Sequence, residues 1–201
     1  MILLTAVIIG LLAGFIRAKI GRRKLQPVWL KFDWLIILAI VPQILAFFVP
    51  TIGASISDTW ARIILVSSLI ILLIFCWINR RQFGFWLFGL GLIFNLLVIS
   101  LNGGLMPIRP ELLMKFFPDA PVGAWEIGQR FGISKDIVLT LDQTRFWWLS
   151  DYFSLPTWFP YRAAFSIGDV ILALGIVLFL WSLGKPSPQP QINNHSEDHY
   201  E

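Results

Sequence analysis

The chain has 201 residues, of which 57% are hydrophobic and 14% are charged, and its mean hydropathy is +0.74. Ordinary soluble domains are about 45–50% apolar and about 25% charged, so this composition excludes a soluble domain of the usual kind. The formal net charge of +4 is accounted for by basic residues that flank apolar segments, and no nucleic-acid partner is expected.

The apolar residues come in blocks and do not alternate with polar residues, as they would in an outer-membrane barrel. A helix needs about 20 apolar residues to cross roughly 30 Å of hydrocarbon. We therefore predict an all-α fold, an integral membrane bundle of about five transmembrane helices. The spans are expected at residues 1–18, 32–49, 60–78, 85–104 and 163–183. The first is predicted to be a retained span and not a signal peptide, because its basic residues follow the apolar run.

Basic residues predict the direction in which the chain crosses the membrane. The connection after the first span carries six of them and the short connection after the third span carries two: Arg17, Lys19, Arg22, Arg23, Lys24 and Lys31, then Arg80 and Arg81. Under the positive-inside rule both connections are cytoplasmic. We therefore expect a multi-pass protein of the bacterial cytoplasmic (inner) membrane, with its N-terminus outside and residues 105–162 outside. The polar segment 185–201 is predicted to be a disordered cytoplasmic tail.

The outside segment is rich in aromatic residues. Residues 145–162 hold eight of them. Because Trp and Tyr gather at the level of the lipid headgroups, this stretch is predicted to cap the outer ends of the helices. Residues 125–131 and 133–141 are expected to form short surface helices.

Few polar residues lie within the predicted spans. Asn95 is expected to make a hydrogen bond between helices. Asn102, with the two glycines that follow it, predicts a helix end, and its side chain belongs either to the helix cap or to a polar site. Gly84 and Gly91 allow close helix approach, either within this chain or against a neighbouring subunit.

Asp169 lies near the start of the last span, where a charge needs an explanation. Ser166 stands three residues earlier, which is the spacing of a capping box, and a carboxylate in the first turn favours the helix dipole. If the helix begins instead at Arg162 or Ala163, Asp169 lies almost two turns inside it and capping no longer explains the charge.

The chain offers few ligands for a metal or a pigment. It has one cysteine, Cys76, and two histidines, His195 and His199, both in the predicted tail. Haem and metal sites in proteins depend largely on His and Cys. We expect neither a metal nor a cofactor.

Three short motifs support a resemblance to a known family: NGGLMP (residues 102–107), WLSD (148–151) and SIGD (166–169). Together they resemble a bacterial membrane-protein family known only as a domain of unknown function, number five-three-one-seven, over roughly residues 1–184. Ser150 stands where the family pattern has glycine. The resemblance implies a fold and a membrane location, and it implies no biochemical activity.

A weaker local resemblance is to lipoprotein signal peptidase, through SDYF followed by FSIGD. It implies an aspartic dyad of Asp151 and Asp169 at the outer surface, in which one carboxyl stays protonated because two close carboxylates cannot both ionise. Asn102, Arg145 and Ser166 would support such a site. The chain departs from the peptidase in having one long loop, and no spans, between the Asn motif and the aspartates.

Two functions follow from these patterns. The first is an integral membrane protein that is not an enzyme, an accessory or assembly subunit whose partners are the lipid bilayer and other membrane subunits. The alternative is a membrane-embedded aspartic hydrolase that uses Asp151 and Asp169.

Overall fold

The computed structural model describes residues 2–21, 29–121, 123–156, 158–159 and 161–183. The predicted tail, both histidines, and Arg22, Arg23 and Lys24 lie outside the described residues. The described part is mostly helical, and all five expected spans contain a long helix. Its elements are α1 (Ile2–Ile20), α2 (Trp34–Phe48), α3 (Pro50–Gly53), α4 (Asp58–Ile78), α5 (Phe85–Leu101), β1 (Met106–Ile108), α6 (Pro110–Phe116), β2 (Asp136–Val138), the 3-10 helix η1 (Trp147–Leu149), β3 (Phe153–Ser154), β4 (Ala164–Phe165) and α7 (Ile167–Ser182).

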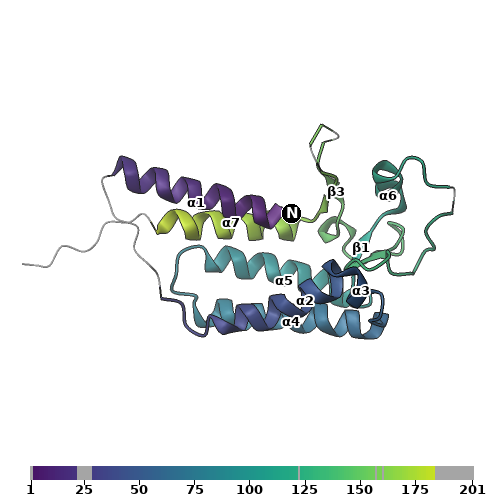
Figure 1. Ribbon diagram of the computed structural model, residues 1–201, viewed down its shortest axis with the longest axis horizontal. Coiled ribbons are helices and arrows are strands. Elements are labelled where there is room, and N and C mark those ends of the chain that lie inside the picture. The colour runs from purple at the N-terminus through teal and green to yellow at the C-terminus, as the bar shows by residue number, and fades with distance from the viewer. Residues whose placement is uncertain (1, 22–28, 122, 157, 160, 184–201) are drawn as a thin grey trace, which may run out of the picture.

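The five long helices lie side by side in an open row, in the order α1, α7, α5, α4, α2 (Figure 1). Each packs mainly on its neighbours in this order, and α2 overlaps α4 in the view of Figure 1. Its core lies between α4, α5 and α7, where the buried side chains include Leu65, Leu92, Ile99 and Leu172. Large apolar side chains on the inner helices remain exposed, among them Ile74, Ile93 and Leu174.

The two ends of the row differ in composition. One end carries the cap, which we define as the described part of residues 105–165; it holds α6, η1 and all four strands (Figure 1). At the opposite end lie the C-termini of α1, α4 and α7 and the N-termini of α2 and α5, together with Arg17, Lys19, Lys31, Arg80 and Arg81. We call this the basic end.

Two helix boundaries differ from the sequence expectation. Helix α5 stops at Leu101 and not at residue 104, because Gly103 and Gly104 take left-handed backbone conformations with φ of +85° and +89°. Helix α7 begins at Ile167 and not at residue 163, because Ala164–Phe165 is used as a strand that pairs with Phe153–Ser154.

The prediction of two short surface helices in the cap is wrong. Residues 125–131 are not helical, and Gly128 has a φ of +89°. Within 133–141, Asp136–Val138 forms strand β2, which pairs in parallel with β1 in the register Met106 to Asp136. Ile137 and Val138 are β-branched and suit a buried strand once β1 supplies a pairing partner.

Among the described residues, two helices have the length and hydropathy needed to cross a membrane. They are Leu3–Ile20 and Asp58–Ile78, with mean hydropathies of 2.0 and 2.6. Three further apolar helices are shorter: Trp34–Phe48, Phe85–Leu101 and Ile167–Ser182.

Candidate functional site

The NGGLMP motif leads the chain from helix α5 into the cap. The side-chain amide of Asn102 donates to the carbonyl of Val98 at 2.7 Å, which caps the helix, and to the carbonyl of Arg145 at 2.9 Å. The Arg145 backbone N–H donates back to Asn102 Oδ1 at 2.9 Å. Asn102 is therefore both a helix cap and a clamp on the segment that contains WLSD.

Strand β1 brings two distant segments together on its two sides. On one side, the Asp151 N–H donates to the Pro107 carbonyl at 3.2 Å. On the other side, the Met106 N–H donates to the Lys135 carbonyl at 2.9 Å. The pairing of β1 with β2 on one side and the isolated bridge from Ile108 to Asp151 on the other place Lys135 and Asp151 close together, although they are 16 residues apart in the chain.

Lys135 and Asp151 form the central ion pair of the site. The Lys135 Nζ lies 2.7 Å from Asp151 Oδ2 and 3.0 Å from Asp136 Oδ1. The Asp151 side chain is only 3% exposed, whereas that of Lys135 is 39% exposed. Asp151 Oδ1 is buried with no hydrogen-bond partner in the described structure. The pair therefore neutralises a buried carboxylate on one oxygen and leaves the other oxygen free.

The protonation of this pair reflects its surroundings. Burial raises the pKa of Asp151 to about 7; Lys135 opposes this shift, while the charges of Asp169 and Asp136 add to it. Burial alone would lower the pKa of Lys135, but Asp136, Asp151 and Asp169 together raise it. Lys135 therefore stays charged, and Asp151 is the group that titrates near neutral pH.

The SIGD motif forms a capping box at the start of α7, as the sequence predicts. Ser166 Oγ accepts from the Asp169 N–H at 3.0 Å, and Asp169 Oδ2 accepts from the Ser166 N–H at 3.2 Å. Asn95 on α5 joins this box: its Nδ2 donates to Asp169 Oδ1, and its Oδ1 accepts from Ser166 Oγ, both at 2.9 Å. The interhelical hydrogen bond expected of Asn95 is confirmed.

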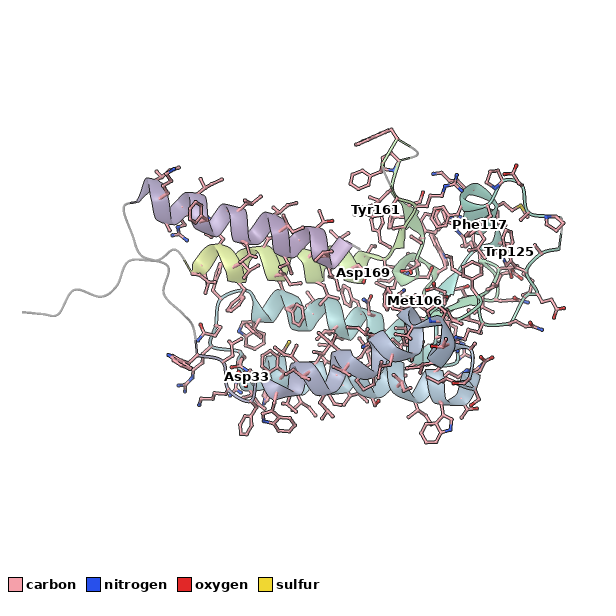
Figure 2. All side chains as sticks on the ribbon, viewed as in Figure 1. Asp33, Met106, Phe117, Trp125, Tyr161 and Asp169 are labelled. Carbon is pink, nitrogen blue, oxygen red and sulfur yellow. The ribbon has the colours of Figure 1, made fainter. Side chains whose placement is uncertain are left out.

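The structure gathers all three motifs at the cap end of the row, where Figure 2 shows Asp169 and Met106. The charge of Asp169 contributes to the raised pKa of Asp151. The two carboxyl groups make hydrogen bonds to different partners, Lys135 for Asp151 and Asn95 and Ser166 for Asp169. Arg145 contributes its backbone to the Asn102 clamp, and its side chain is exposed.

Sequence reasoning missed Lys135. The residue lies in a segment for which a surface helix was the expectation, and a solvated helix would have left its charge in water. Only the pairing of β2 with β1 turns it toward Asp151. In the described part of the chain, no group of three or more His, Cys, Asp or Glu side chains is arranged to hold a metal ion.

Chemically, this arrangement can act as an acid or a base. A buried carboxyl that titrates near neutral pH lies beside a permanently charged lysine and within the field of a second carboxylate. Such a carboxyl can hold or release a proton under physiological conditions.

Comparison with known proteins gives a family and no activity. The chain is 29% identical over 138 residues to an uncharacterised protein of Thermotoga maritima, which covers 66% of this chain and 70% of the relative. No solved structure matches the chain. The model of a family of unknown function, DUF5317, matches residues 27–181, which include the three motifs, helices α2, α4 and α5, and α7 up to its last residue but one. The protein belongs to the DUF5317 family.

Proposed function

We propose that the protein is an integral membrane protein whose five long helices all cross the bilayer, with the cap closing one end. The observation that carries this proposal is the uncovered apolar surface of the helix row. Each long helix has large apolar side chains that are 50–65% exposed: Leu4, Ile37, Ile74, Ile93 and Leu174 are examples, one from each helix. A soluble monomer rarely exposes apolar surface on this scale, whereas lipid covers it without cost.

Burial and length agree with this proposal. Only 22% of the apolar window in α1 and 33% of that in α4 is buried, unlike the core helix of a soluble protein. The shorter helix α2 has 15 residues, about 22 Å at 1.5 Å per residue, and the extended residue Val49 separates it from the short helix α3. Helix α7 has 16 residues, about 24 Å at 1.5 Å per residue, and a thinner bilayer or local thinning accommodates this length at modest cost.

The charges of the two ends support an orientation. The short connections at the basic end carry five described Arg and Lys residues and one acid, Asp33, whereas the six Arg and Lys residues of the longer cap are matched by six Asp and Glu residues. Under the positive-inside rule the basic end is cytoplasmic and the cap is extracytoplasmic, in the inner membrane of a bacterium. The N-terminus is then outside and the C-terminus inside.

We assign the protein a role that is not enzymatic, as an accessory or assembly subunit of a membrane complex. The exposed apolar side chains of the inner helices support this role, because another membrane subunit can pack on them. Gly84 and Gly91 do not support this role, because α7 of the same chain packs directly against both of them.

Cysteine labelling tests the orientation. In a Cys76→Ala background, Asp119→Cys in the cap should react with a membrane-impermeant maleimide in intact cells, and Ser187→Cys should react only after lysis. Labelling of Ser187→Cys in intact cells would overturn the orientation. Extraction in mild detergent followed by native mass spectrometry tests the accessory role, which a chain extracted without any protein partner would contradict.

One observation favours the aspartic hydrolase as a second candidate. The charge of Asp169 helps to raise the pKa of Asp151, which is the electrostatic relation that an aspartic dyad needs. In that mechanism Asp151 would serve as the acid while Asp169 activates water. Against it, Lys135 occupies one oxygen of Asp151, and both oxygens of Asp169 accept bonds in the capping box.

Conservative substitution separates the two candidates. If the hydrolase interpretation holds, Asp151→Asn and Asp169→Asn should each abolish processing of membrane proteins, measured as new N-termini in the membrane fraction, with abundance unchanged. The exposed Asp119→Asn serves as the matched control. We expect the accessory role to hold, so that Asp169→Asn complements a deletion strain as well as Asp119→Asn does.

A further inference from the structure

The hairpin formed by β3 and β4 extends away from the rest of the cap. Phe153 pairs with Phe165 and Ser154 with Ala164, and a further hydrogen bond from the Leu155 N–H to the Ala163 carbonyl, at 3.1 Å, continues the ladder. Figure 1 shows the hairpin projecting sideways from the cap end of the row, past α1, which is the edge helix. Its tip is therefore directed across the helix axes and not along them.

Aromatic residues form the tip of this hairpin. Trp158 is 78% exposed, its ring lies 5.6 Å from that of Phe159, and the Phe159 ring lies 5.0 Å from that of Tyr161. Arg162, which follows, is exposed. Thr157 and Pro160 lie outside the described residues. The exposed apolar surface of an indole at the end of a projecting hairpin has an unfavourable free energy in water, and transfer of the ring into a lipid interface removes this cost.

A contact with α1 determines the level of the tip along the helix axis. The Tyr161 hydroxyl lies 3.1 Å from Thr5 Oγ1, near the start of α1. Beyond Thr5, the outward face of α1 is apolar, with Ile8, Ile9 and Leu12 all about half exposed. The tip therefore lies beside the cap end of α1 and next to that apolar face.

We propose that this hairpin is a lipid-binding element that places Trp158 and Phe159 in the headgroup region of the outer leaflet, beside α1. This inference rests on the proposed membrane span of α1. Trp and Tyr favour the boundary between headgroups and acyl chains, because their rings are apolar and their polar atoms remain in the wet layer. Arg162 stands where it can meet lipid phosphate. Lipid is the occupant because the tip adjoins the exposed apolar face of α1, which lies at the edge of the row and packs mainly on α7, and because the exposed Arg162 beside the tip complements lipid phosphate.

Spin labelling of the full chain in liposomes of phosphatidylethanolamine and phosphatidylglycerol tests the inference. In a Cys76→Ala background, single labels are placed at Trp158→Cys in the tip, Leu12→Cys on α1 and Asp119→Cys in the cap. Collision of each label with oxygen, which enters lipid, is compared with its collision with a water-soluble nickel chelate. We expect the ratio of oxygen to nickel collisions at position 158 to be several-fold higher than at 119, and to lie between the values at 119 and 12. Phe159→Cys replaces Trp158→Cys if that variant is not recovered.

Each other outcome overturns the inference in a distinguishable way. A label at 158 as open to nickel as that at 119, with a lipid-like label at 12, shows a tip in water while the membrane span stands. A label at 158 shielded from both reagents shows a tip covered by protein, either a second copy or a partner. A label at 12 that is open to nickel overturns both the span of α1 and the inference that rests on it.

Discussion

Two buried asparagines, Asn79 and Asn102, make the same set of hydrogen bonds at opposite ends of the helix row. Each follows a long helix and donates to the carbonyl four residues earlier, Phe75 or Val98. Each also exchanges two hydrogen bonds with the backbone of a distant residue, Lys31 for Asn79 and Arg145 for Asn102. An amide side chain can do this because it carries both donors and an acceptor, like a peptide group. These residues hold the connecting segments against the helices.

Also at the scale of single residues, substitution of Asp169 distinguishes a helix-capping role from a catalytic role. Asp169→Asn keeps one acceptor oxygen but presents an N–H to one of the two donors, Asn95 or Ser166, so we expect a cost of about 1 kcal/mol. Asp169→Ala loses both bonds and leaves the Asn95 amide unpaired, at about 2 kcal/mol. In detergent these costs correspond to decreases of the Tm of about 2–8 °C, measured by intrinsic fluorescence. An Asp169→Ala protein with the Tm of the exposed control Asp119→Asn would show that the capping box contributes nothing.

At the scale of elements, four glycines determine how closely α5 and α7 approach. A Cβ on Gly91 would lie 2.6 Å from the carbonyl oxygen of Gly168, and a Cβ on Gly84 would lie 2.5 Å from that of Gly175. Gly84 and Gly91 on α5 are seven residues apart, as are Gly168 and Gly175 on α7. Because the two helices are antiparallel, the Gly91–Gly168 contact and the Gly84–Gly175 contact lie about two turns apart along them. The close approach is what lets Asn95 reach the start of α7.

Two glycines of α5, Gly91 and Gly89, allow a matched test of this packing. Gly91→Ala would force apart two backbones that cannot rotate away, and we expect a loss of about 1–3 kcal/mol. Gly89→Ala lies in the same helix, but its Cβ would meet only Cys76 Cβ at an ordinary 3.7 Å. That substitution should be neutral or stabilising by up to about 1 kcal/mol, since alanine is the better helix former. Equal Tm values for the two variants would contradict the close approach of α5 and α7.

At the scale of the whole molecule, Lys135 and Asp151 hold the strands of the cap together where they adjoin the helix row. The folded-state pKa of Asp151, about 7, lies above its ordinary value of 3.8. The folded protein therefore binds this proton more tightly than the unfolded chain does. The contribution to stability is complete below the ordinary pKa and is lost as the pH rises through about 7.

Removal of the lysine should enlarge this pH dependence. Lys135→Met leaves a buried carboxylate without its cation, and we expect a loss of about 1–3 kcal/mol at pH 8, after allowance for the partial exposure of Lys135. At pH 5 Asp151 is protonated, so the loss should be smaller. Lys135→Met/Asp151→Asn should recover most of the stability at pH 8. Tm values at the two pH values, with limited proteolysis of the cap, provide the measurement; a defect that is the same at both pH values would contradict the role of the pair.

Local signals in the sequence were sufficient for the helices and for one part of the site. Hydropathy placed all five long helices, and the spacing of Ser166 and Asp169 predicted a capping box that the structure confirms. The glycines after Asn102 predicted that α5 ends near them, although the helix stops at Leu101, three residues before the expected bound. These features arise from interactions within one helix or one turn, so the residues that cause them are adjacent in the chain.

The order of the helices in the row, the pairing of β1 with β2 and the ion pair of Lys135 with Asp151 were decided only by the tertiary structure. The segment around Lys135 reads equally well as a short helix, and it becomes a strand because β1 is available about 30 residues earlier to satisfy its backbone groups. The raised pKa of Asp151 likewise depends on its burial in the folded protein and on the charges of Lys135, Asp169 and Asp136, which are distant from it in the chain. Such contacts join distant residues, and no local pattern of hydropathy or capping encodes them.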